Sequence, residues 1–166
     1  MKKINFEYPD ELSKNVGKIS LHFQRLQYVI FEFVSWLLGD TNTARKEICS
    51  YSFDRLVKLM DLLVTKELSI IASVKDEYEK VYNTLKAVQS RRNKTIHSNF
   101  IITYNEKTFT VRYNIKDVFH KGKIDLKSIK KIDINELESL KELTKKAVSD
   151  LSDFYSKFRA LSSLRN

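Results

Sequence analysis

Apolar side chains crowd the stretch from Val16 to Leu38 so densely that a helix made from it would be apolar on almost every side. They are Ile19, Leu21, Phe23, Leu26, Val29, Ile30, Phe33, Val34, Trp36 and Leu37. A helix of this kind is normally buried all round. In a chain of 166 residues, it predicts either a central helix or one that also faces a partner subunit. Gly39 and Asp40 follow the stretch and predict its end.

The whole chain holds few residues that interrupt helices, because it has three glycines and one proline. Residues 41–67 show a second apolar helical face, with Thr41 or Thr43 as the expected N-cap. The first three helices are expected within residues 16–98, and the third of them ends in the last residues of this range. A long last helix is expected at residues 133–162. We therefore predict a single domain that is mainly α.

Between the third and the last helix the hydrophobic period changes from helical to alternating. Phe109, Val111 and Tyr113 alternate with polar residues, which is typical of a half-buried strand. Residues 100–104 are rich in strand-forming side chains, and a shorter strand is expected near 124–126. The predicted fold class is a four-helix up-down bundle with a small three-stranded antiparallel β-meander, at residues 99–132, inserted before the last helix.

The charge balance favours an anionic partner. The chain has a net charge of +9 and a sequence pI near 9.5, which suits a polyanion such as RNA, although a solvated lysine-rich surface would give the same balance. Cys49 is the single cysteine, so no disulfide within the chain and no cysteine zinc site are expected. No signal peptide is visible, and the apolar run at 26–38 is too short for a membrane span. We expect a cytoplasmic protein with no membrane contact.

Residues 91–99, Arg-Arg-Asn-Lys-Thr-Ile-His-Ser-Asn, combine the groups needed to cleave a phosphodiester without a metal ion. An arginine carries a permanent planar charge that matches phosphate oxygens, and we assign this part to Arg92. A histidine can accept or donate a proton near neutral pH, and we assign this part to His97. Asn93 would orient the substrate, while Arg91 and Lys94 would form a basic rim against the RNA backbone. The alternative is a basic helix end that the helix dipole favours.

The spacing Arg92-Asn93-x-x-x-His97, with a polar residue directly after the arginine, resembles the signature of the HEPN superfamily. The place of the signature late in a third helix also resembles that family, and so does the strand segment after it. The resemblance implies a small helical domain with metal-independent endoribonuclease activity, acting as a toxin or a phage-defence effector, without a cofactor. It also implies an antitoxin or defence-system partner. Asn99 departs from the pattern of many HEPN toxins, which have a tyrosine there.

The five-residue separation between Arg92 and His97 bears on the oligomeric state. On a regular helix the two side chains diverge by roughly 140°, so they converge only if the arginine stem wraps round, the helix ends near His97, or a second subunit completes the site. The resemblance implies the last of these, because HEPN pairs build one cleft from two copies of the motif. We therefore expect a homodimer.

Glu32 is an acidic residue within the apolar first helix. A carboxylate in such surroundings usually has a partner, and we consider Arg92 or Arg25 for this role and a pocket as its possible site. No metal site is predicted, because the three histidines belong to different elements. The alternative to a nuclease is a non-catalytic module that binds RNA, a nucleotide or a protein through the same basic surface. A purely structural helical dimer is the third possibility.

Overall fold

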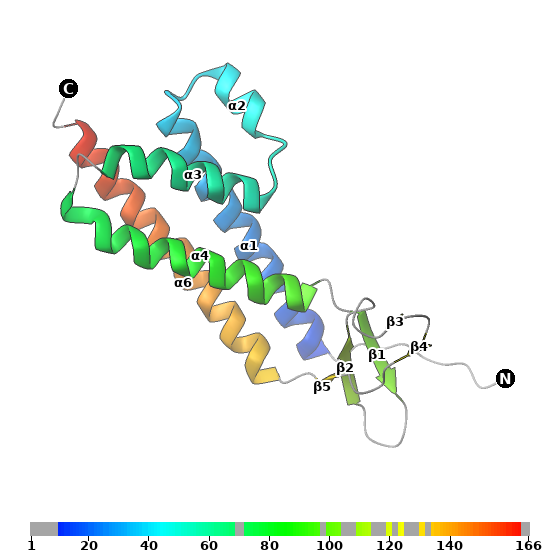
Figure 1. Ribbon diagram of the computed structural model, residues 1–166. Coiled ribbons are helices and arrows are strands. Elements are labelled where there is room, and N and C mark those ends of the chain that lie inside the picture. Colours follow the sequence, from blue (N-terminus) through cyan, green and yellow to red (C-terminus); the bar gives the residue numbers. More distant parts are fainter. Residues whose placement is uncertain are drawn as a thin grey trace.

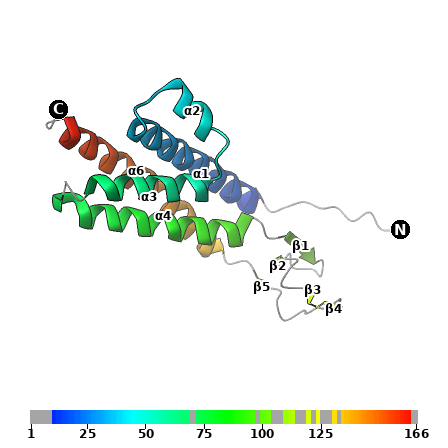
Figure 2. The same ribbon diagram turned by 45° about the horizontal axis from the view of Figure 1, so that its top comes forward.

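The computed structural model describes residues 10–68, 72–96 and 134–163, together with short strands between the last two ranges (Figure 1). The helices are α1 (Asp10–Leu37), α2 (Asn42–Ile48), α3 (Phe53–Leu68), α4 (Lys75–Ile96) and α6 (Ile134–Ser163), with a 3-10 turn, η1, at Ala72–Val74. The strands are β1 (Asn99–Thr103), β2 (Phe109–Tyr113), β3 (Phe119–His120), β4 (Lys123–Ile124) and β5 (Lys130–Lys131). The strands lie beyond the end of the helices at which α4 ends and α6 begins (Figures 1 and 2).

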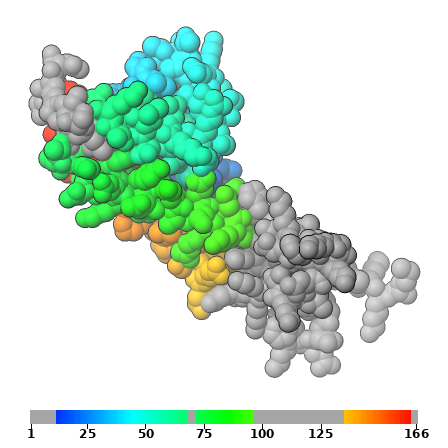
Figure 3. Space-filling view, in the orientation of Figure 1, coloured from blue at the N-terminus to red at the C-terminus, as the bar shows by residue number. Residues whose placement is uncertain are grey.

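The core lies along α1, and a group of aromatic rings from α1 and α6 packs there among aliphatic side chains. Phe33 is fully buried, and its ring centroid lies 4.7 Å from that of Tyr155 and 5.6 Å from that of Phe158. Burying an aromatic side chain of this size stabilises a fold by about 1.5–3 kcal/mol. The α1–α6 contact is therefore the main packing interface, and α3 and α4 cover α1 and α6 on the side seen in Figure 3.

Helix α1 begins earlier than predicted, at Asp10 rather than at residue 16. The added turns are held by a second, smaller apolar cluster in which Leu12 and Ile19 of α1 pack with Leu137 and Leu140 of α6. The density of apolar residues in this part of the sequence is low. The helix forms here because α6 covers the few apolar side chains that there are.

The predicted end of α1 is confirmed. Gly39 and Asp40 have positive φ angles of 84° and 52°, and their amide groups donate to the carbonyl groups of Trp36 and Ser35. Left-handed residues at this position satisfy carbonyl groups that a helix leaves open at its end. The predicted N-cap at Thr41 is also confirmed, because its hydroxyl accepts a hydrogen bond from the Ala44 amide at 3.1 Å.

The predicted second helix, at residues 41–67, is two helices. Helix α2 ends at Ile48, and α3 begins at Phe53 after a four-residue connection. Ser52 opens α3, since its hydroxyl accepts from the Arg55 amide and its carbonyl from the Leu56 amide. A serine that satisfies open amide groups in this way competes with helix continuation. The serine pair at 50 and 52 was the signal for this break.

Because α2 carries the chain back along α1, α3 starts beside the middle of α1 and not at its far end. The ring of Phe53, the first residue of α3, lies 4.5 Å from the ring of Phe23 on α1. Helices α1, α3 and α6 consequently run in the same direction, and α4 runs opposite to them (Figure 1). The bundle is therefore not the up-down arrangement that we predicted.

The predicted fold class is wrong in its β part as well. Where side chains are described, the chain is almost entirely helical, in five helices rather than four. The strands do not form a consecutive three-stranded meander: β1 pairs with β2, and β2 pairs next with the distant β5, while β3 and β4 form a separate ribbon. The alternating pattern in the sequence does not reveal which strands pair, because a period of two fixes the faces of a strand and not its neighbour.

Candidate functional site at the end of α4

The basic signature occupies the last turns of α4, where helical geometry fixes its side chains. Arg91, Arg92, Asn93 and Lys94 all lie within α4. Thr95 is buried next to them, and its hydroxyl donates to the carbonyl group of Arg91 at 2.9 Å. Cations at this end of a helix are favoured by the partial negative charge of the open carbonyl groups. The sequence thus concentrates positive charge at one defined point of the bundle.

Arg92 is half-buried and has a defined position. Its guanidinium carbon lies 4.6 Å from the centroid of the Phe23 ring on α1, and its Nη1 donates to Asn93 Oδ1 at 3.3 Å. A guanidinium over an aromatic face is attracted by the ring quadrupole. Asn93 is itself exposed and lies beside this group. Phe23 was not among the predicted site residues, because its contact with Arg92 depends on how α1 and α4 pack.

Arg91 does not stand free at the surface as a basic rim residue would. Its Nη2 donates to the carbonyl oxygen of Glu136 at 3.3 Å and to the hydroxyl of Ser139 at 3.2 Å. Both acceptors lie in the first turns of α6. Arg91 therefore joins the end of α4 to the start of α6 and supports the position of Arg92 next to it. Lys94 is exposed at the same end of the helix.

His97, the predicted proton-transfer residue, lies outside the described residues, which reach Ile96 at the end of α4. Its sequence position places it directly after the helix that holds Arg92. Among the described residues, no group of three or more His, Cys, Asp or Glu side chains is placed to hold a metal ion.

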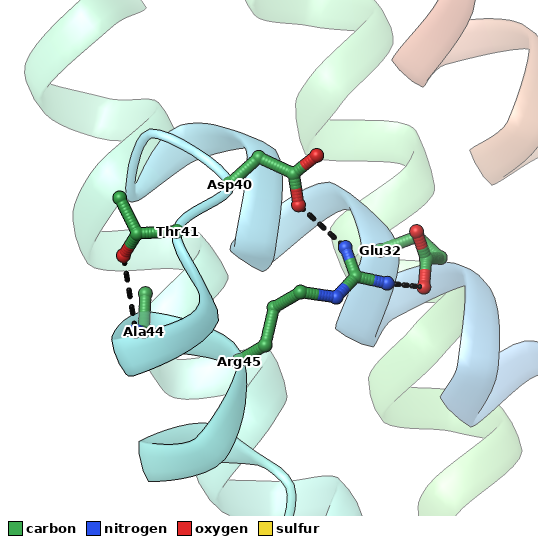
Figure 4. A network of polar contacts seen from close by, with 5 residues as sticks. All are labelled: Glu32, Asp40, Thr41, Ala44 and Arg45. Carbon is green, nitrogen blue, oxygen red and sulfur yellow. Dashed lines mark hydrogen bonds and ion pairs between the residues drawn. The ribbon is translucent and has the colours of Figure 1, made fainter.

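Glu32 is paired with neither Arg92 nor Arg25, the two partners that we considered. Its carboxylate accepts from Nη2 of Arg45 on α2 at 2.5 Å, while Nη1 of the same arginine donates to Asp40 at 2.5 Å (Figure 4). These hydrogen bonds, first the one that Arg45 donates to Asp40 and then the one to Glu32, raise the pKa of the Arg45 guanidinium. Arg45 is the first cationic residue after Glu32 along the chain, and this was the signal in the sequence for the pairing of the two residues. We call this set of three residues the ionic clip.

The ionic clip borders a second feature, a hollow of about 310 Å³ between α1 and the returning α2–α3 segment. The residues that line it from α1 are Gln24, Gln27, Tyr28 and Phe31, and those that line it from the other side are Cys49, Tyr51 and Leu56. We call it the α1–α2 groove. The Arg45 guanidinium lies 5.3 Å from the Phe31 ring centroid, so the clip holds α2 in place along this side. Nothing in the sequence pattern predicted the groove, because it depends on the break between α2 and α3.

Two further findings concern the chain as a whole. No described helix is both long enough and apolar enough to cross a membrane. Comparison of the sequence with models of known families and with curated proteins, and of the structure with solved structures, finds no match.

Proposed function

We propose that the protein is a metal-independent endoribonuclease of the HEPN type, with its site at the end of α4. The observation that carries the proposal is the position of Arg92, whose guanidinium is held between the Phe23 ring and Asn93. An arginine held in one place stabilises charge that develops on a phosphate without having to reorganise during the reaction. The net charge of +9 supports RNA as the substrate, because phosphate contacts dominate binding to nucleic acids.

In the proposed reaction the 2′-hydroxyl of the RNA attacks the adjacent phosphorus. The hydroxyl proton passes to His97, a bond forms between the 2′-oxygen and phosphorus, and the bond from phosphorus to the 5′-oxygen breaks. The departing 5′-oxygen takes up a proton from the imidazolium of a second copy or from water. The products are a 2′,3′-cyclic phosphate and a free 5′-hydroxyl. Arg92 stabilises the additional negative charge on the phosphorane oxygens.

We infer that two copies of the chain complete the site. The resemblance to HEPN domains supports this, because HEPN pairs build one cleft from two copies of the motif, and a two-fold axis near the end of α4 would set the arginine of one copy opposite the histidine of the other. Light scattering at micromolar concentration should give the mass of two chains. The mass of one chain, in a preparation that still cleaves RNA, would contradict the dimer and leave the chemistry standing.

The experiment for the chemistry is cleavage of a labelled RNA in EDTA by the parent and by His97→Ala. We expect the His97→Ala rate to fall by a factor on the order of a hundred to ten thousand, which is the usual contribution of a placed general acid or base. Arg92→Ala should lose rate and affinity together, and Arg92→Lys should restore little of either, since an ammonium makes no planar two-pronged contact. Lys86→Ala, an exposed cation two turns earlier on α4, is the matched control.

Three outcomes contradict the nuclease proposal. They are cleavage of DNA, which has no 2′-hydroxyl, cleavage that EDTA abolishes, and a His97→Ala protein as fast as the parent. RNA binding that salt weakens, without any cleavage, would identify the alternative, a non-catalytic RNA-binding module.

A further inference from the structure

The α1–α2 groove is separate from the end of α4 and contains groups that packing does not explain. Tyr28 is 62% exposed, although it lies on a helix whose other large side chains are mostly covered. A large aromatic side chain that is exposed beside a hollow is available to contact a ligand there. The chemistry of the residues that line the groove therefore indicates which class of ligand it would bind.

Three aromatic side chains, those of Tyr28, Phe31 and Tyr51, line the groove. Tyr51 lines the hollow from the connection between α2 and α3, and its hydroxyl contacts a carboxylate oxygen of Glu47 at 3.4 Å. The guanidinium carbon of Arg55 lies 3.6 Å from the centroid of the Tyr51 ring, so one face of that ring is covered. A planar ligand stacked on Tyr28 would be received by rings that are already held in place, which lowers the entropic cost of binding.

Two primary amides lie among these rings. Gln24 and Gln27 are three residues apart on α1, so they share one face of the helix. Neither amide makes a hydrogen bond to another described residue of the chain. Each offers a donor and an acceptor side by side, which is the pair that a nucleobase edge matches in a two-pronged contact.

The charge and the size of the groove further limit the class of ligand that it can bind. Arg55 is exposed and its guanidinium covers the ring of Tyr51, so a cation lies beside one of the lining residues and could pair with a phosphate attached to a bound base. The hollow of about 310 Å³ lies at the small end of the range for ligand pockets, which suits one base better than a helical peptide. A helical peptide would also require a continuous apolar groove, whereas here amides interrupt the rings.

We propose that the α1–α2 groove binds a single nucleobase, stacked on Tyr28 and hydrogen-bonded through Gln24 or Gln27. The base belongs either to a free nucleotide or to an unpaired position of a nucleic acid strand. Stacking on an aromatic ring is the usual way in which proteins hold an unpaired base. The site does not depend on cleavage at the end of α4, so each proposal can fail without the other.

The test follows the fluorescence of 2-aminopurine, which stacking quenches, on titration with the full chain. One arm uses the 2-aminopurine mononucleotide, and the other a single-stranded octamer that carries one 2-aminopurine and 2′-O-methyl riboses throughout. The methyl groups block attack by the 2′-oxygen, so the octamer stays intact if the protein is a nuclease. Binding of the mononucleotide identifies a nucleotide site, and binding of the octamer alone identifies a base within a strand.

Tyr28→Ala should weaken binding by a factor on the order of ten or more, the usual contribution of one base stacked on one ring. Tyr28→Phe keeps the ring and should bind like the parent, while Gln27→Ala should lose a smaller factor. Leu21→Ala is the matched control, because Leu21 is on the same helix, is 66% exposed and does not line the groove. Since Tyr28 and Leu21 are both exposed, neither variant should fail to fold.

The proposal is overturned if the parent quenches neither probe, or if Tyr28→Ala quenches as strongly as the parent. It is also overturned if light scattering shows that Tyr28→Ala turns a dimer into a monomer, because a second copy would then fill the groove. Unmodified RNA cut by a Tyr28→Ala protein that no longer binds the probes would support both the base site and the separate nuclease site.

Discussion

The two sides of α1 differ in how their apolar residues are used. On the inner side, Ile19, Leu26, Ile30 and Phe33 are completely buried against α3 and α6. On the outer side, Leu21 is 66% and Tyr28 is 62% exposed, and the space beside Tyr28 is the α1–α2 groove. A helix that is apolar on every side therefore does not have to be buried on every side. The apolar residues left in contact with water are the ones to examine for binding.

The largest effect that tests this contrast is expected at Phe33. Phe33→Ala should reduce the free energy of unfolding by about 3–5 kcal/mol, because it opens a cavity among rings that cannot close around it. Tyr28→Ala, the outer counterpart, should change the same quantity by less than about 0.5 kcal/mol. Denaturant unfolding followed by circular dichroism measures both. Similar losses in the two variants would show that the outer side of α1 is also covered in solution.

A smaller effect is expected where a polar group takes part in the packing. Tyr78 is buried on α4, and its hydroxyl donates to a carboxylate oxygen of Asp61 on α3 at 2.9 Å. Tyr78→Phe should cost about 1–2 kcal/mol near neutral pH, since it leaves a half-buried carboxylate without its donor. The Tyr82→Phe change on the same helix is the control, because it leaves the contact between Tyr78 and Asp61 in place.

The same tyrosine should limit stability in alkali. Burial, followed by the hydrogen bond to Asp61, raises the pKa of Tyr78 above its ordinary value. The unfolded chain therefore releases this proton first, and the contribution of Tyr78 is complete below pH about 10 and declines as the pH rises further. The parent should lose stability above that pH more steeply than Tyr78→Phe. Equal slopes in unfolding titrations between neutral and alkaline pH would contradict the pKa direction.

The next effect concerns the ionic clip at the edge of the groove. Arg45→Met should lower the thermal midpoint at low salt, because Glu32 and Asp40 lose the cation that they share. The arginine is one third exposed, so the loss should be modest and should shrink in 1 M salt, where exposed ion pairs are screened. Titration of the Arg45→Met protein with the two 2-aminopurine probes tests whether the ionic clip also maintains the shape of the α1–α2 groove. A loss that salt does not change would mean that the arginine acts through packing on Phe31.

The smallest effect is expected at Leu21. Leu21→Ala should leave the free energy of unfolding within about 0.5 kcal/mol of the parent, since most of the side chain is already in water. Denaturant unfolding at two protein concentrations measures this. A clear loss that grows with protein concentration would show that a second copy covers Leu21, and the outer side of α1 would then be an interface.

The sequence predicted the parts of this fold that local chemistry decides. The end of α1 at Gly39 and Asp40, the cap at Thr41 and the helix that carries the signature all follow from residues close in sequence. It did not predict the return of the chain through α2 or the common direction of three helices. Those features depend on which apolar faces meet, as when Phe53 meets Phe23. Periodicity does not contain that information.

For the site, the sequence identified the charged groups but not their surroundings. It placed Arg91 and Arg92 at the end of a helix, and the structure adds Phe23 under one guanidinium and α6 beside the other. It also predicted that Glu32 would have a partner, but Arg45 is separated from it by a turn whose path is set by two left-handed residues. Partners across such a turn become clear only when the backbone is known.

The contact of Arg91 with Glu136 and Ser139 has a consequence for how the chain can vary. It holds the end of α4 and the start of α6 together at the two points between which the strand segment leaves and re-enters the helices. The entropy of closing a loop between fixed ends depends only weakly on its length, by about 0.6 kcal/mol for each doubling. The strand segment can therefore lengthen, shorten or be exchanged at little cost to the helices. The helical body can therefore stay the same while that segment changes.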